Sequence, residues 1–335
     1  MSFIRPAGMG LAGGIAFGLP RAGLPIRKVP PLSENAPVSP PETASPYDGP
    51  YDGNAPSARL RQFVLGMLYP LKPGRLGDAP FLAAHIVADT LRRRQGPPDA
   101  ADIRARPAGY AGIAWDVSTP TVLEAARRGF YPHAHVGPMK WWSPAERAVM
   151  MLDRVHIAKR FRRTMRASDA VLTFDLDFER VLDACAAPRP GRTPLTWITP
   201  RAKELYLRLH REGHAHSVEL RAADGTLEGG LFGLTVGPVF SALSMFHTAD
   251  NASKLAIVGL YHHLAEWGFA AVDHQVMSPW VETLGGIVLP RAEFEALLKR
   301  PAPAAAEPGR WTARYSPVDT AAWQPAGEAE DRAAA

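Results

Sequence analysis

The sequence predicts an α+β fold built on an antiparallel sheet. Two turn signals, Asp224-Gly225 and Gly237-Pro238, divide residues 214–247 into three strand-like segments. A helical pattern follows over residues 253–268, and a short apolar strand lies at 270–276. This order of three strands, a helix and a fourth strand is typical of a domain in which a splayed sheet carries helices.

The composition predicts a folded centre between biased ends. Of the 335 residues, 46% are hydrophobic, which can supply a sizeable core, whereas the 33 prolines cluster towards the termini. We divide the chain into a disordered Pro/Gly-rich segment, a helical N-terminal extension, a small aromatic-rich subdomain with a basic helix, the main α+β domain, and a tail on which Trp311 and Tyr315 are placed to dock. These parts are expected at residues 1–56, 57–105, 106–168, 169–300 and 301–335.

Helix signals also precede the predicted sheet. A helix is expected to begin at Ser118 or Thr119 and to end at Gly129. Residues 170–186 have the pattern of a strand followed by a helix. Thr199 has the position of an N-cap for a helix that ends at Gly213.

Residues 130–144 are predicted to be a proline-punctuated loop rich in aromatic side chains. Trp141 and Trp142 lie in it, and a loop does not need such side chains for solubility. We therefore expect at least one of them to pack beneath the loop.

Charge and cysteine content limit the possible partners and compartment. A formal charge of +5 permits a polyanionic partner without requiring one. The single cysteine, Cys185, fits a reducing cytosol, and no apolar run approaches the roughly 20 residues that cross a membrane. Five cations gather on one predicted helix, a pattern typical either of a solvated face or of a nucleic-acid contact: Lys159, Arg160, Arg162, Arg163 and Arg166.

Asp273 and Gln275 are the strongest candidates for chemistry. They lie two residues apart on a predicted strand, so both side chains are expected on one face, with His274 on the other. A carboxylate beside a carboxamide can orient the amide and stabilise an amine that attacks an ester. The same pair could equally satisfy backbone groups at the end of a strand.

Other chemistries are disfavoured. The sequence has no P-loop, no dinucleotide-binding glycine motif and no nucleophile elbow, and His214 and His216 lack a third metal ligand at a suitable spacing. We expect no metal and no cofactor. The strand order is that of a GCN5-type acyltransferase core, but residues 247–254 contain no glycine that could cradle the pyrophosphate of coenzyme A.

A series of short motifs recurs in one order over residues 112–300, namely RRGFYP, WWSPAER, CAAPRP, TWIT, LHREGHAHSVE, GGLFG, SMF, NASK, VDHQ and TLGG. Through this order the chain resembles the leucyl/phenylalanyl-tRNA–protein transferases. Members of that family move leucine or phenylalanine from aminoacyl-tRNA to the N-terminal Lys or Arg of a protein, which marks the protein for degradation. The resemblance implies the same cytoplasmic, cofactor-free activity here.

The resemblance also implies roles for individual residues. Asp273 and Gln275 would be the catalytic pair, and Trp197 and His133 would enclose the terminal adenosine of the tRNA. The cations between Lys159 and Arg166 would follow the acceptor arm of the tRNA. The pocket for the transferred amino acid would be lined by Leu231, Phe240, Leu243 and Ser244.

Two positions depart from the family pattern. Leu243 stands where the family usually has a glutamate, and His133 stands where it usually has a tryptophan. Two alternatives therefore stay open besides the transferase. One is a non-catalytic relative that binds a protein N-terminus or the end of a tRNA, and the other is an acyltransferase that uses a different carrier.

Overall fold

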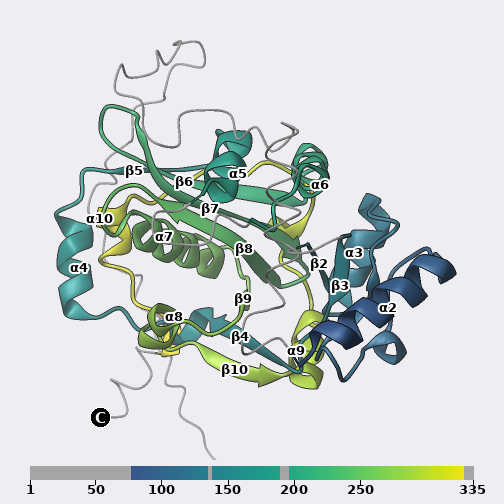
Figure 1. The fold of residues 1–335 in the computed structure, drawn as a ribbon. Coiled ribbons are helices and arrows are strands. Elements are labelled where there is room, and N and C mark those ends of the chain that lie inside the picture. Colours follow the sequence, from purple (N-terminus) through teal and green to yellow (C-terminus); the bar gives the residue numbers. More distant parts are fainter. Residues whose placement is uncertain (1–76, 135–137, 189–195, 328–335) are drawn as a thin grey trace, which may run out of the picture. The chain divides into compact units, whose positions relative to one another are not determined.

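The computed structural model describes residues 77–134, 138–188 and 196–327, and these residues form a mixed α+β fold with two sheets (Figure 1). The smaller sheet is antiparallel and has the order β1 (Tyr110–Ile113), β3 (Lys140–Trp142), β2 (Tyr131–His133). The larger sheet has the order β10-β4-β9-β8-β7-β6-β5. Its strands are β4 (Glu146–Met151), β5 (Val171–Phe174), β6 (Ala215–Arg221), β7 (Leu227–Val236), β8 (Val239–His247), β9 (Ala271–Gln275) and β10 (Ile287–Pro290).

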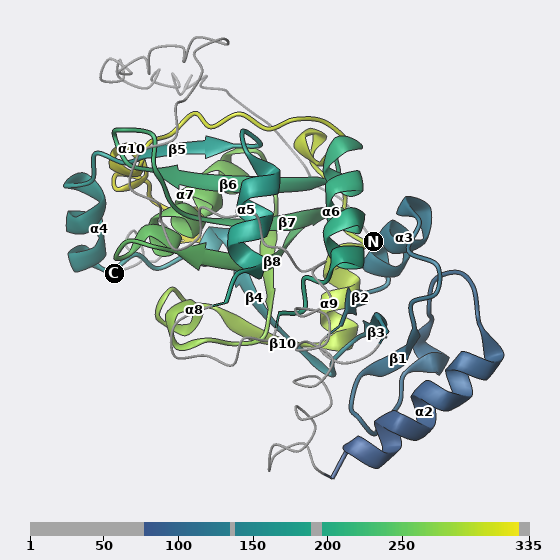
Figure 2. The same cartoon turned by 45° about the horizontal axis from the view of Figure 1, so that its top comes forward.

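Helices cover both faces of the larger sheet. Figure 2 shows α5 and α6 on one face and α7 on the other, and each face has its own apolar core. In the described part of the chain no helix is long and apolar enough to span a membrane. The longer helices are α2 (Ala79–Arg92), α3 (Thr119–Arg127), α4 (Lys159–Arg166), α5 (Phe178–Ala186), α6 (Pro200–Arg211), α7 (Ala252–Glu266) and α9 (Arg291–Leu298), and the short ones are α8 (Pro279–Thr283) and α10 (Pro317–Thr320).

The local helix signals of the sequence are confirmed. Helix α3 stops before Gly129, whose φ of +81° is accessible to glycine at little cost. The Thr199 side chain caps α6 by accepting a hydrogen bond from the backbone N–H of Ala202. Strands β6, β7 and β8 meet at the two predicted turns, and α7 and β9 follow in the predicted order.

The structure corrects the prediction in three places. Residues 130–144 contain β2 and β3, so this stretch is part of a sheet rather than a loop, with Trp141 buried. Strand β4 lies inside the larger sheet, which therefore extends across the predicted boundary at residue 168. The predicted tail is packed as far as Trp323, although its last residues, like the predicted segment 1–56, lie outside the described residues.

Gly233 explains part of the glycine-rich stretch of β7. A Cβ atom at this position would lie 2.4 Å from the ring of Phe240 on the neighbouring strand. Only a residue without a side chain lets that ring lie flat against the strand. Phe240 belongs to the apolar core on the α7 side of the sheet, so Gly233 makes room for one of its side chains.

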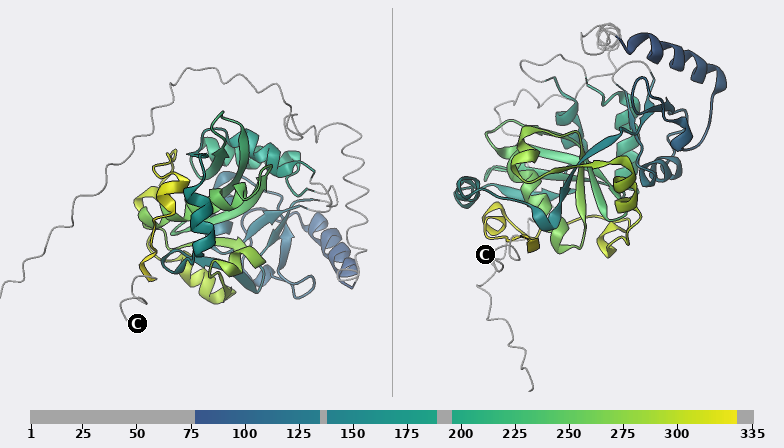
Figure 3. Two further views of the ribbon diagram at one scale, coloured as in Figure 1. Left: turned by 90° about the vertical axis from the view of Figure 1, so that its left-hand side faces the viewer. Right: turned by 90° about the horizontal axis from the view of Figure 1, so that it is seen from below.

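Three buried polar groups fasten the C-terminal segment, drawn in yellow beside α4 in Figure 3. The Arg162 guanidinium donates to the carbonyl oxygens of Ala321 and Trp323. Asp175 accepts the backbone N–H of Trp311, whose ring stacks on His216. The third group is His263, whose Nε2 accepts the backbone N–H groups of Arg314 and Tyr315.

We expect acid to loosen this segment. His263 Nε2 can accept two hydrogen bonds only when it carries no proton, and burial lowers the pKa of His263 to about 4. Between pH 6.5 and 4 the unfolded chain therefore binds a proton that the folded chain excludes. The free energy of unfolding should be at its full value above pH 6.5 and fall by about 3 kcal/mol per such histidine as the pH approaches 4.

Urea unfolding at several pH values tests this expectation on the wild type and on His263→Gln. The variant should lose part of the pH dependence, whereas His247→Gln, which changes an exposed histidine, should keep all of it. An identical pH dependence in wild type and His263→Gln would exclude His263 as the titrating group.

Candidate functional site

The candidate site lies where the two parallel strands of the larger sheet separate. Strands β8 and β9 pair over three residues and end this pairing at Ser241 and Asp273. Beyond that point each strand keeps only its neighbour on the other side, which is β7 for β8 and β4 for β9. The last pair of the ladder thus stands at the opening between two diverging strands, where backbone and side-chain groups are free of ladder partners on one side.

The Asp273 carboxylate is buried and fully occupied. One oxygen accepts from Arg147 Nε at 3.1 Å and from the backbone N–H of Gln275 at 2.8 Å. The other accepts from Ser241 Oγ at 2.8 Å and from the second arm of the Arg147 fork. Because a carboxylate offers about four acceptor positions, this one has none left for an attacking amine.

Arg147 holds this arrangement from strand β4. Its remaining guanidinium nitrogen donates to the carbonyl oxygen of Gly129 at 2.9 Å, and its side chain is 4% exposed. The cation also lies over the rings of Tyr131 and Phe294. A planar guanidinium group whose three nitrogens each donate to a fixed acceptor can be supplied by arginine and not by lysine.

Gln275 is positioned differently from the prediction. A bulge in the pairing of β4 with β9 interrupts the strand alternation between Asp273 and Gln275, and Gln275 has a φ of +63°. The expectation that both side chains share a face by simple alternation is therefore wrong. The link between the two residues is the backbone hydrogen bond, which leaves the half-buried carboxamide of Gln275 outside the ion pair.

His274 turns towards α7, where its Nε2 lies 2.6 Å from the hydroxyl of the buried Tyr261. Burial lowers the pKa of His274 to about 4, so the ring is neutral at physiological pH. This contact makes His274 part of the packing between β9 and α7.

A second bulge, on β8, brings Leu243 to the cavity beside the ion pair. Phe232 pairs with Ser244 and Gly233 with Ala242, so Leu243 is the extra residue. Leu243 is half-buried and lines a cavity of about 20 Å³ together with Arg147 and Asp273. That volume holds about one water molecule. Ser244 follows on the same strand and is also half-buried.

Leu231 and Phe240 are placed apart from this cavity. Both are 0% exposed and belong to the apolar core that packs against α7, whereas Leu243 packs against the core on the side of α5 and α6. Phe240 also contacts the Trp311 ring. The structure therefore does not bring these two residues together with Leu243 as one lining.

His133 and Trp197 come together as predicted, but they contact each other. Their ring centroids lie 5.2 Å apart with 23° between the planes. His133 ends β2, and Trp197 lies just before α6. Trp197 is also held by Phe232 and Tyr206, so it is a supported platform.

The basic helix α4 contains one residue that cannot serve as predicted. Arg162 is 8% exposed and donates to three backbone carbonyl oxygens, those of Ile157, Ala321 and Trp323. It is a structural anchor rather than a phosphate ligand. The other four cations of the cluster are exposed: Lys159, Arg160, Arg163 and Arg166. Figures 1 and 2 show α4 at the end of the sheet away from β2 and β3.

Arg147 and Ser241 were missed by the sequence-based prediction. Arg147 lies next to the apolar run Ala148–Met151, and an arginine beside such a run marks a buried strand with a charge to neutralise. Ser241 was missed because nothing in the sequence indicates that its strand, β8, is the parallel neighbour of β9, which carries Asp273.

Comparison with known proteins assigns the family. The family model described as leucyl/phenylalanyl-tRNA protein transferase matches residues 149–299. A leucyl/phenylalanyl-tRNA–protein transferase of Pseudomonas syringae pv. tomato is 42% identical over 189 residues, which are 56% of this chain and 82% of the relative. One from Xanthomonas oryzae pv. oryzae is 39% identical over 239 residues, which are 70% of this chain and 94% of the relative. The chain belongs to this family.

Similarity to solved structures is weak. The L-PGS of Bacillus licheniformis superposes with a TM-score of 0.31 at 12% identity, over 47% of this chain and 64% of its own. A similarity at this level carries no conclusion about the site.

The buried ion pair predicts a large and specific effect on stability. Arg147→Met leaves the Asp273 carboxylate buried without its counter-charge and should lower the free energy of unfolding by about 3–5 kcal/mol. Adding Asp273→Asn to this variant should restore part of the loss because the uncompensated charge is removed.

Urea denaturation of the single and double variants measures this coupling. Arg128→Met is the matched control, because Arg128 pairs with Glu124 on the exposed side of α3 and should matter by less than about 1 kcal/mol. Strictly additive effects of Arg147→Met and Asp273→Asn would show that the two charges do not stabilise each other.

Proposed function

We propose that this protein transfers leucine or phenylalanine from aminoacyl-tRNA to the N-terminal amine of a protein that begins with Lys or Arg, as a tag for degradation. The observation that carries the proposal is family membership, since the chain spans 94% of one relative with that activity in its name. The geometry at the end of β9 supplies groups suited to the reaction. In this transfer the amine nitrogen bonds to the ester carbonyl carbon, the bond from that carbon to the ribose oxygen breaks, and a proton from the amine passes to the ribose oxygen, which leaves as a hydroxyl.

We place this activity on a GCN5-type acyltransferase core. The feature that favours such a core is the parallel pair β8 and β9, which separates after three residues. An opening of this kind lets an acyl group approach the diverging strands without breaking a sheet edge. The charged tRNA would take the place of an acyl-coenzyme A donor.

Within this site Gln275 is the group proposed to touch the reacting atoms. Its carboxamide can donate to the developing oxyanion and accept from the attacking amine. Asp273 is a positioning residue, because its carboxylate is saturated by Arg147, Ser241 and the Gln275 backbone. This assignment replaces the simpler expectation that Asp273 interacts directly with the amine.

Gln275→Ala should lower kcat about 100-fold to 1,000-fold while leaving tRNA affinity and unfolding temperature nearly unchanged, because one oxyanion donor is lost. Asp273→Asn should lower kcat and the unfolding temperature together, since it also disrupts the ion pair. Transfer of radiolabelled leucine or phenylalanine to an Arg-initiated peptide measures the first effect, and calorimetry measures the second.

Gln324→Ala, which removes an exposed carboxamide in the C-terminal segment, is the matched control and should transfer like the wild type. Full activity in Gln275→Ala would refute the assignment of Gln275. Absence of transfer in the wild type with tRNA still bound would favour the non-catalytic binding protein.

We further propose that the terminal adenosine enters between His133 and Trp197. A ring between two others needs about 7 Å between the outer planes, since stacked atoms approach to about 3.5 Å. The observed 5.2 Å between the two ring centroids is too short, so the pair has to open by about 2 Å. Contacts of the tRNA backbone would fall to the exposed cations of α4 and not to Arg162.

Trp197→Ala should raise KM for aminoacyl-tRNA about tenfold or more, because base stacking contributes about 1–3 kcal/mol per base. His133→Trp should lower KM by enlarging the second platform. Both effects are measured in steady-state transfer, with Trp267→Ala, which changes a half-buried tryptophan at the end of α7, as the control. Unchanged KM in Trp197→Ala would place the adenosine elsewhere.

A further inference from the structure

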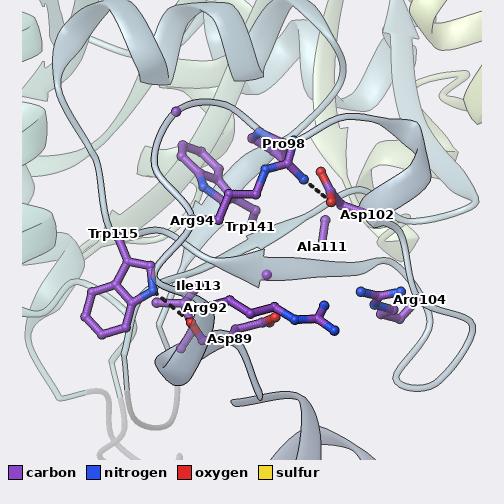
Figure 4. A pocket seen from close by; sticks show the side chains of 12 residues that line it. Asp89, Arg92, Arg94, Pro98, Asp102, Arg104, Ala111, Ile113, Trp115 and Trp141 are labelled. Atoms are coloured by element: carbon purple, nitrogen blue, oxygen red, sulfur yellow. Dashed lines mark hydrogen bonds and ion pairs between the residues drawn. The ribbon is translucent and has the colours of Figure 1, made fainter. Parts of the chain in front are cut away.

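A second pocket, of about 130 Å³, lies beside the smaller sheet and outside the family-model match (Figure 4). Its walls are the C-terminal end of α2, the short helix at Ala100–Asp102, and strand β1. Trp115 and the buried Trp141 form apolar surfaces of the pocket. This volume is several times that of the cavity beside Asp273 and leaves room for a phosphate group.

Three arginines line this pocket, and the side chains of two of them have no hydrogen-bond or ion-pair partner in the described chain. Arg94 is paired with Asp99 and Asp102. The side chains of Arg92 and Arg104 form no hydrogen bond or ion pair with the rest of the described chain. Figure 4 shows their guanidinium groups facing each other from α2 and from the loop before β1.

Neither aspartate of the pocket forms an ion pair with these two cations. The Asp89 carboxylate accepts the Tyr110 hydroxyl at 2.6 Å, and Asp102 is held by Arg94 and by the backbone N–H of Asp99. Arg92, Arg94 and Arg104 still outweigh the two lining carboxylates by one charge, and the carboxyl end of α2 subtracts only about half a charge. Two arginine forks converging beside an apolar wall are the arrangement that binds phosphate.

The pocket lies in line with the proposed adenosine position. His133 of β2, Lys140 of β3 and Ile113 of β1 are register partners in one row across the smaller sheet. Ile113 lines the pocket, so the pocket begins two strand spacings, or about 10 Å, from His133. Stacked nucleotides advance about 3.4 Å each, so this distance spans about three nucleotides.

We propose that Arg92 and Arg104 bind a backbone phosphate of the tRNA acceptor arm, about three nucleotides from the adenosine at His133 and Trp197. This assignment rests on the proposed function for its choice of RNA. It gives the N-terminal extension a contact near the 3′ end of the tRNA, whereas the exposed cations of α4 lie at the other end of the larger sheet.

The test is the binding of deacylated tRNA over a range of salt concentrations by Arg92→Gln/Arg104→Gln. The Kd should rise about tenfold, and the slope of log Kd against log salt should fall by about one, because one phosphate contact is lost. The control, Arg211→Gln/Arg300→Gln, removes the same charge from exposed arginines outside the pocket and should keep the wild-type slope. Equal effects of the two double variants would overturn the assignment.

Transfer from two donors separates this inference from the proposed function. The pocket variant should transfer poorly from aminoacyl-tRNA and like the wild type from a 3′-aminoacyl-adenosine, which has no phosphate. Loss with both donors would mean that the substitutions damage the site itself and would overturn the phosphate assignment. If the wild type transfers from neither donor, the proposed activity fails, while the salt dependence of tRNA binding still decides the role of Arg92 and Arg104.

Discussion

The ion pair between Arg147 and Asp273 is the interaction on which the site depends. It joins β4 to β9, and through Ser241 it also joins β8, at the point where the parallel pairing stops. A sheet that opens at this point leaves polar groups without ladder partners, and burial makes such groups costly. Arg147 fills two acceptor positions on Asp273, and Ser241 and the Gln275 backbone fill two more, so the opening is held by charge and hydrogen bonds instead of by a continuous ladder.

Two bulges turn this frame into a site. The one on β9 lifts Gln275 out of the strand alternation, and the one on β8 turns Leu243 towards Arg147 and Asp273. Leu243 is the extra residue of its bulge, and Gln275 directly follows His274, the extra residue of the other bulge. Gln275 and Leu243 therefore both lie where the strands diverge. The resemblance implies a glutamate at the position of Leu243, and the cavity indicates what leucine changes there. With leucine there, Arg147 has one carboxylate partner among the cavity-lining residues, whereas a glutamate would compete with Asp273 for the same guanidinium.

Much of the fold could be predicted because its signals are local. The Thr199 cap, the glycine stops and the two turns of the central strands depend on neighbouring residues, and they appear in the structure where expected. Strand β4 could not be placed in this way, because its partners, β9 and β10, lie more than one hundred residues away. Arg147 shares this difficulty, since only the tertiary fold shows that it faces Asp273.

Arg162 shows why composition alone misassigned a basic cluster. The five cations of α4 look equivalent in sequence, yet helical periodicity turns Arg162 and Met165 inward while Arg163 and Arg166 remain exposed. A buried guanidinium needs several acceptors, and the C-terminal backbone supplies them. The same reasoning distinguishes Arg94, which is paired with two aspartates, from Arg92 and Arg104. Whether an arginine binds phosphate is thus decided by the acceptors that the fold has already given it, and not by how many other arginines are nearby.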